Sequence, residues 1–71
     1  MRKKLRMLRL SKNLSQQEMA KRLGVSYVTY SQVELGKRDG SLKFWGALQE
    51  KFFIPNNAMY DYMINEGETA E

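Results

Sequence analysis

Residues that stop helices divide this chain into five segments, each about as long as a short helix. The dividing residues are Asn13, Gly24, Gly36, the pair Asp39–Gly40, and Pro55. Within the segments apolar residues recur three or four positions apart, as they do on the buried side of a helix, and no stretch is typical of a strand. The sequence therefore predicts an all-α, compact five-helix domain.

Two of the segments have a serine before them and a glycine after them. Ser15 and Glu18 form a capping-box pattern that starts a helix, and Gly24 ends it. Ser26 caps the next helix, which is expected to end at Gly36. Two short helices joined around a glycine are typical of a helix-turn-helix, whose second helix can enter the major groove of DNA. Other helical hairpins share this spacing, so it leaves the alternatives open.

The other three segments are expected to complete the core. The first covers residues 3–12 with a narrow apolar stripe and should lie across the others as a surface helix. Ser41 caps the fourth, which Pro55 ends, and the fifth is expected over residues 57–64. The expected core side chains are Leu5 and Leu8 in the first, Leu42, Trp45, Leu48 and Phe52 in the fourth, and Met59, Tyr62 and Met63 in the fifth.

The composition rules out several kinds of chemistry. The 71 residues suit one domain, expected over residues 1–64 and followed by a frayed acidic tail at 65–71, and the chain has neither cysteine nor histidine. Thiolate metal sites and the commonest general base are excluded, so we expect no enzyme, no metal and no cofactor. No apolar run suits a membrane span or a signal peptide, and we expect a cytoplasmic, nucleoid-associated protein of a bacterial host.

Basic residues gather in the first part of the chain. Residues 1–43 carry eleven lysines and arginines against three acids, a net charge of +8. Residues 44–71 carry one lysine against five acids, a net charge of −4. Such an uneven distribution of charge indicates one face that meets a polyanion, although a solvated basic helix would give similar net charges. Charge alone therefore favours nucleic-acid binding only slightly.

Residues 14–26, LSQQEMAKRLGVS, resemble the helix-turn-helix core of the phage Cro and repressor family, also called the XRE type. Residues 29–38 and 41–42 continue the pattern, and the resemblance covers about residues 5–54. It implies a lambda-repressor-like fold, with the helix-turn-helix over about residues 15–35. Core, turn, cap and basic positions agree together, which makes the resemblance more specific than a lone short motif.

The resemblance also implies roles for individual side chains. The recognition helix, at about residues 26–35, would lie in the major groove and present four side chains to base edges: Tyr27, Val28, Ser31 and Gln32. Seven side chains would hold phosphates: Gln16, Gln17, Ser26, Thr29, Lys37, Arg38 and Lys43. Arg9 and Glu34 match a paired arginine and glutamate that lock the first helix onto the third.

Two positions depart from the family pattern. Gly40 stands where the family usually has proline, which predicts a looser loop, and Phe53 replaces the small residue usual after the fourth helix. Phe44, Phe53 and Tyr60 also add aromatic side chains beyond the usual core. Where such side chains are exposed, they mark a partner surface.

The leading hypothesis is a sequence-specific transcriptional regulator that binds double-stranded DNA, a Cro-like repressor of phage or mobile-element type. It is expected to bind as a homodimer on an operator of two half-sites. The alternative is an anti-repressor, or modulator, that binds a partner repressor protein through the aromatic surface. Neither hypothesis involves a membrane.

Overall fold

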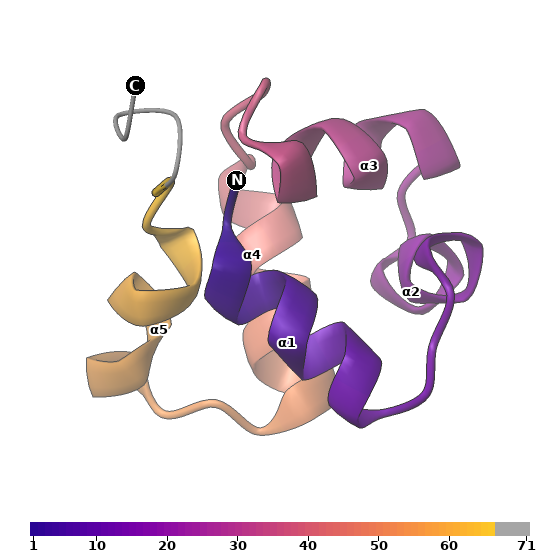
Figure 1. The fold of residues 1–71 in the computed structure, drawn as a ribbon. Helices are drawn as coiled ribbons and strands as arrows, with labels where there is room; N and C mark the ends of the chain where they lie inside the picture. Colours follow the sequence, from indigo (N-terminus) through magenta and orange to yellow (C-terminus); the bar gives the residue numbers. More distant parts are fainter. Residues whose placement is uncertain (67–71) are drawn as a thin grey trace.

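The computed structural model describes residues 1–66, and these form five α-helices and no strand (Figure 1). The helices are α1 (Lys3–Ser11), α2 (Gln16–Leu23), α3 (Tyr27–Leu35), α4 (Leu42–Phe52) and α5 (Asn56–Met63). The predicted all-α, five-helix fold is therefore confirmed. The end of α4 lies ahead of Pro55, because Phe53 takes a left-handed conformation, with φ of 56°, that stops the helix.

Serine caps start the three central helices. The Ser15 hydroxyl accepts a hydrogen bond from the Glu18 amide at 3.1 Å, and the Glu18 carboxylate accepts one from the Ser15 amide at 2.8 Å. These bonds complete the predicted capping box and lower the pKa of the Glu18 carboxyl. Ser26 and Ser41 cap α3 and α4 through their hydroxyls. Two left-handed glycines, with φ of 73° and 87°, end α2 and α3: Gly24 and Gly36.

The core gathers buried side chains from α1 to α4 and from the turn before α5. Its apolar members are Leu5, Met19, Ala20, Leu23, Tyr30, Val33, Phe44, Trp45, Leu48 and Ile54. Aromatic rings join α3 to α4: Tyr30 is stacked on Phe44 with ring centroids 6.1 Å apart, and Phe44 meets Trp45 edge to face at 4.8 Å. These ring contacts with α4 therefore help to fix the position of α3.

Two predicted core positions are wrong, because Leu42 is 91% exposed and Met63 is also exposed. Phe44, predicted as part of a partner surface, is instead buried between Tyr30 and Trp45. The cause is the direction in which α4 faces. Its buried stripe starts at Phe44, and this orientation leaves the first residue of the helix in solvent.

Figure 1 shows how the helices are arranged around this core. α3 lies along one edge of the molecule, and α2 leads away from its N-terminal end. α1 crosses in front of α4, and α5 packs beside α1 on the side away from α2. Among residues 1–66, therefore, no helix packs over one side of α3.

The two ends of the described chain meet near the C-terminal end of α3. The Glu66 amide donates to the Met1 carbonyl at 3.0 Å, and the Asn65 side chain donates to the Gly36 carbonyl at 2.9 Å. These hydrogen bonds hold Asn65 and Glu66, which the sequence placed in a frayed tail. The rest of that expected tail, residues 67–71, lies outside the described residues.

Candidate nucleic-acid interface

The four predicted base-reading side chains share the side of α3 that faces away from the core. Tyr27 is 47% and Val28 is 55% exposed. Ser31 and Gln32 lie one helical turn further along the same side of the helix and are half-buried. The structure therefore brings all four together on one side of one helix.

α2 and α3 meet at a tight turn held by hydrogen bonds. The Val25 amide donates to the Ala20 carbonyl at 3.0 Å, and the half-buried Val25 side chain packs against the core. The Ser26 hydroxyl accepts from the Thr29 amide and donates to the Thr29 hydroxyl at 2.9 Å. This turn sets the angle at which α3 leaves α2, and it places two predicted phosphate-binding hydroxyls at the start of α3.

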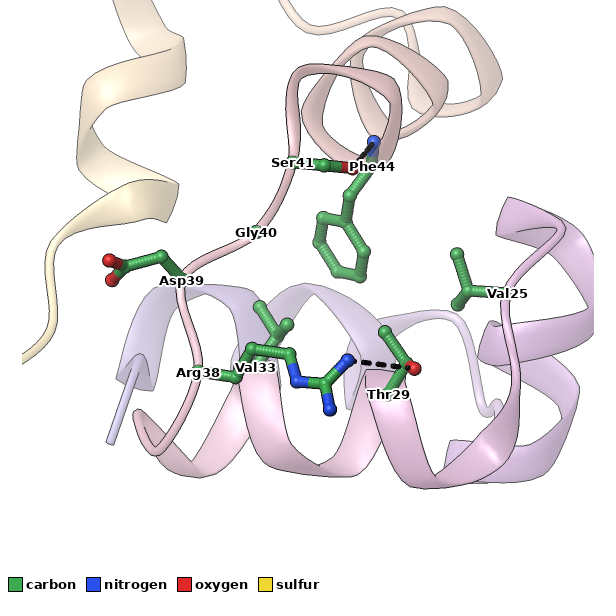
Figure 2. A pocket seen from close by; sticks show the side chains of 8 residues that line it. All are labelled: Val25, Thr29, Val33, Arg38, Asp39, Gly40, Ser41 and Phe44. Carbon is green, nitrogen blue, oxygen red and sulfur yellow. Dashed lines mark hydrogen bonds between the residues drawn. The ribbon is translucent and has the colours of Figure 1, made fainter.

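The loop between α3 and α4 carries two exposed cations, Lys37 and Arg38. Arg38 turns back along α3, and its guanidinium donates to the Thr29 hydroxyl at 3.3 Å (Figure 2). Lys43 is exposed in the first turn of α4, where the helix dipole also favours an anion. All three predicted phosphate-binding cations thus lie after α3 or at the start of α4.

A small pocket lies between α3, this loop and the start of α4 (Figure 2). Its volume is about 120 Å³, below the range of about 300–1,000 Å³ typical of cofactor sites. It is lined by Val25, Thr29, Val33, Arg38, Asp39, Gly40, Ser41 and Phe44. Within residues 1–66 no three acidic side chains gather where they could hold a metal ion, and no helix is long and apolar enough to cross a membrane.

The two glutamines at the start of α2 have different surroundings. Gln17 is exposed, whereas the side-chain nitrogen of Gln16 donates to a Glu34 carboxylate oxygen at 3.1 Å. An amide NH₂ group has two hydrogens, so Gln16 can still donate to a phosphate oxygen. Glu34 thereby holds this predicted phosphate contact in one orientation.

Comparison with known proteins assigns this arrangement to a family. The profile of the helix-turn-helix family matches residues 5–55, which include α2, α3 and α4. The chain belongs to the XRE-type helix-turn-helix family. A Methanocaldococcus jannaschii protein named as an uncharacterized HTH-type transcriptional regulator is 43% identical over 61 residues, covering 76% of this chain and 92% of that protein. No solved structure matches the chain. Family and relative together support a DNA-binding transcriptional regulator.

In this helix-turn-helix protein a buried ion pair fastens α1 to α3. Arg9 donates through Nε and Nη2 to the two Glu34 oxygens, at 2.9 and 3.1 Å. Arg9 also donates to the Leu14 carbonyl at 2.8 Å, which ties in the segment before α2. Glu34 accepts a further hydrogen bond from the Tyr30 hydroxyl at 2.6 Å. The sequence indicated the pair but not the additional donors, Tyr30 and Gln16.

These contacts determine the ionisation states in the lock. Burial by itself would raise the pKa of Glu34, but hydrogen bonds from Arg9, Tyr30 and Gln16 outweigh it and hold that pKa below its ordinary value. The hydrogen bond to Glu34 raises the pKa of Arg9. Burial, followed by the hydrogen bond to Glu34, raises the pKa of Tyr30. At neutral pH the lock therefore holds one carboxylate, one guanidinium and one neutral phenol.

Two of the three aromatic residues predicted as a partner surface are exposed in this family member. Phe53 is 90% exposed at the end of α4, and Tyr60 is 71% exposed on α5. The left-handed conformation of Phe53 costs a residue with a Cβ about 1–2 kcal/mol. Phe44 is buried, so the prediction is wrong for that residue.

One functional candidate, Arg2, does not stand out in the sequence from the other basic residues in the first part of the chain. It is 4% exposed, and its guanidinium donates to the Arg38 carbonyl in the loop after α3. Gly40 in the same loop lies so close to the Trp45 indole that a Cβ would collide with it. This close approach accounts for a glycine at residue 40. No local signal indicated the burial of Arg2, because its side-chain hydrogen-bond partners lie 31 to 61 positions away.

Proposed function

We propose that this protein is a sequence-specific repressor that binds double-stranded DNA, of the Cro-like phage or mobile-element type, with α3 as its recognition helix. The observation that carries the proposal is the division of α3 into two sides. One side is held by the core and by the buried Glu34 ion pair, while Tyr27 and Val28 face solvent on the other. A helix held in this way can dock in a major groove without rearrangement.

Base readout is assigned to the exposed side of α3. Gln32 has the donor and acceptor needed to bond an adenine edge at two points, and the Val28 methyl groups suit a thymine methyl. Tyr27 and Ser31 carry hydroxyls that can reach a base edge or the groove wall. Each good bidentate contact contributes about 1–3 kcal/mol of discrimination against the wrong base.

Phosphate contacts are assigned to side chains at the start of α2, at the start of α3, in the loop after α3 and at the start of α4. They position the protein on the duplex without reading its sequence, and each neutralised phosphate steepens the salt dependence of binding. The proposed contacts are Gln16, Gln17, Ser26, Thr29, Lys37, Arg38 and Lys43.

A homodimer on two half-sites is the proposed assembly on DNA. The centres of the half-sites would lie about 34 Å apart, one turn of the double helix. The proposed location is the cytoplasm of a bacterial host, where the protein acts at the nucleoid and represses by occupying a promoter. The proposed function is binding alone, with no catalytic step.

Selection of binding sites from random duplexes, followed by equilibrium binding to the selected site, tests the proposal. Gln32→Ala should weaken binding to the selected site about 5- to 150-fold, while binding to unrelated duplex stays unchanged. Asn57→Ala, an amide truncation on α5, serves as the matched control and should change neither. Absence of a selected sequence, or equal losses on selected and unrelated duplexes, would contradict sequence-specific readout by α3.

A second candidate function rests on the exposed rings of Phe53 and Tyr60. In this alternative the protein is an anti-repressor that binds a partner repressor through these rings. Phe53→Ala and Tyr60→Ala should then abolish its effect on the partner's promoter, whereas Gln32→Ala should leave that effect intact. The opposite pattern would support the DNA-binding repressor.

A further inference from the structure

The guanidinium of Arg2 joins four parts of the fold that the sequence keeps apart. It donates through Nη1 to the Val33 carbonyl at 2.7 Å and to the Arg38 carbonyl at 3.0 Å. Its Nε donates to the Met63 carbonyl at 2.9 Å, at the end of α5. The guanidinium also lies 5.5 Å from the centre of the Trp45 ring, on α4. Only a planar fork with several donors can meet these partners at once.

This arrangement places a cation where two helices end. Val33 is in the last turn of α3 and Met63 is the last residue of α5, so their carbonyls lie at the negative ends of the helix dipoles. The backbone amide of Arg2 adds a hydrogen bond to the Glu34 carbonyl at 2.8 Å. Arg2 therefore holds the C-terminal end of the recognition helix through both its backbone and its side chain.

The same side chain restrains the loop that carries the proposed phosphate contacts. Besides the hydrogen bond to the Arg38 carbonyl, Nη2 of Arg2 lies 3.5 Å from the exposed Asp39 carboxylate. Lys37 and Arg38 project from this short stretch of backbone. Its path determines where their cationic ends meet the duplex.

We propose that Arg2 is a positioning residue for DNA binding. It contacts no DNA and orients Lys37 and Arg38 by holding the end of α3 and the following loop; this inference rests on the proposed function. The burial of Arg2 argues against a direct phosphate contact. A lysine at residue 2 keeps the positive charge but lacks the fork, so Arg2→Lys separates positioning from charge.

The test measures the slope of log affinity against log salt concentration on the selected duplex. Arg2→Lys should reduce the magnitude of the slope by about 1 to 2, the loss expected for one or two phosphate contacts at roughly 0.9 each. In a protein that already carries Lys37→Ala and Arg38→Ala, the same change should have no further effect. Arg6→Lys repeats the substitution at an exposed position of α1 and should leave the slope unchanged. Ile54→Ala, a destabilising change in the turn between α4 and α5, should also leave the slope unchanged.

Amide hydrogen exchange supplies a readout that needs no DNA. Arg2→Lys should speed exchange at the Gly36 and Lys37 amides, which donate to the Val33 and Gln32 carbonyls, relative to amides within α2. If the variant does not fold, the same measurement on the unaltered protein tests the inference. The Gly36 and Lys37 amides should then exchange as slowly as the amides within α2, and faster exchange at these two amides would overturn the inference.

The two proposals fail in different ways. If the unaltered protein shows no salt-dependent duplex binding, the proposed function is wrong, and hydrogen exchange alone decides whether Arg2 holds the loop. If the unaltered protein binds but Arg2→Lys leaves the slope unchanged, the positioning role of Arg2 is wrong. If Arg2→Lys further reduces the slope in the protein that already carries Lys37→Ala and Arg38→Ala, the positioning role is also wrong, since Arg2 would then act by another route.

Discussion

Replacing Glu34 by glutamine tests the buried lock beneath the recognition helix. The carboxylate accepts two hydrogen bonds from Arg9, one from Tyr30 and one from Gln16. Glutamine has nearly the same shape, but it carries no charge and presents a donor group where a second acceptor is needed. Glu34→Gln should therefore leave the buried Arg9 guanidinium without its counter-charge.

The expected loss of stability is large compared with the stability of so small a domain. Removing one partner of a buried ion pair typically costs about 3–5 kcal/mol. A chain of 71 residues has a free energy of unfolding of roughly 4–10 kcal/mol. At about 4–8 °C for each kcal/mol, the thermal midpoint should fall by at least about 12 °C.

Thermal and urea unfolding followed by circular dichroism measure this loss. Glu50→Gln, the same substitution at an exposed position of α4, is the matched control and should leave the free energy of unfolding unchanged. Adding Arg9→Met to Glu34→Gln removes the stranded cation and should recover part of the loss. A loss below about 1 kcal/mol for Glu34→Gln, or no recovery in the double variant, would refute the reasoning.

Three further predictions concern the same lock and the helix ends. Stability should fall as the pH drops below about 4.5, the ordinary pKa of a glutamate, because the unfolded chain protonates Glu34 at a higher pH than the folded protein does. Urea midpoints measured from pH 7 to pH 3 test this. In Glu34→Gln the urea midpoint should change less with pH. Gly36→Ala should destabilise the fold by about 1–2 kcal/mol, since φ is 87° and the added methyl group would meet the Asn65 side chain; an unchanged thermal midpoint would contradict this. Phe53→Gly should stabilise the fold by about 1 kcal/mol, because the ring is exposed and φ is 56°; a lower urea midpoint would show that the ring has a stabilising contact.

The helix boundaries near the proposed interface were predictable because their causes are local. The hydroxyls of Ser15 and Ser26 meet amides three residues further along, and Gly24 and Gly36 adopt left-handed conformations one residue after the helix. Such interactions are encoded within a few neighbouring positions. The grouping of the predicted base readers on one side of α3 follows from the same local geometry, because side chains four positions apart share a helix face.

Tertiary structure decided which side of α4 faces inward and which cation is buried. Leu42 and Phe44 are both apolar, and Phe44 is the one buried, where its ring contacts Tyr30 of α3 and Trp45. From the sequence, Arg2 is expected to be an exposed cation. In the structure its guanidinium instead donates to carbonyls from α3, the following loop and α5. Helix ends could be predicted from the sequence because their energetics depend on adjacent residues, whereas burial depends on distant segments that meet only when the chain folds.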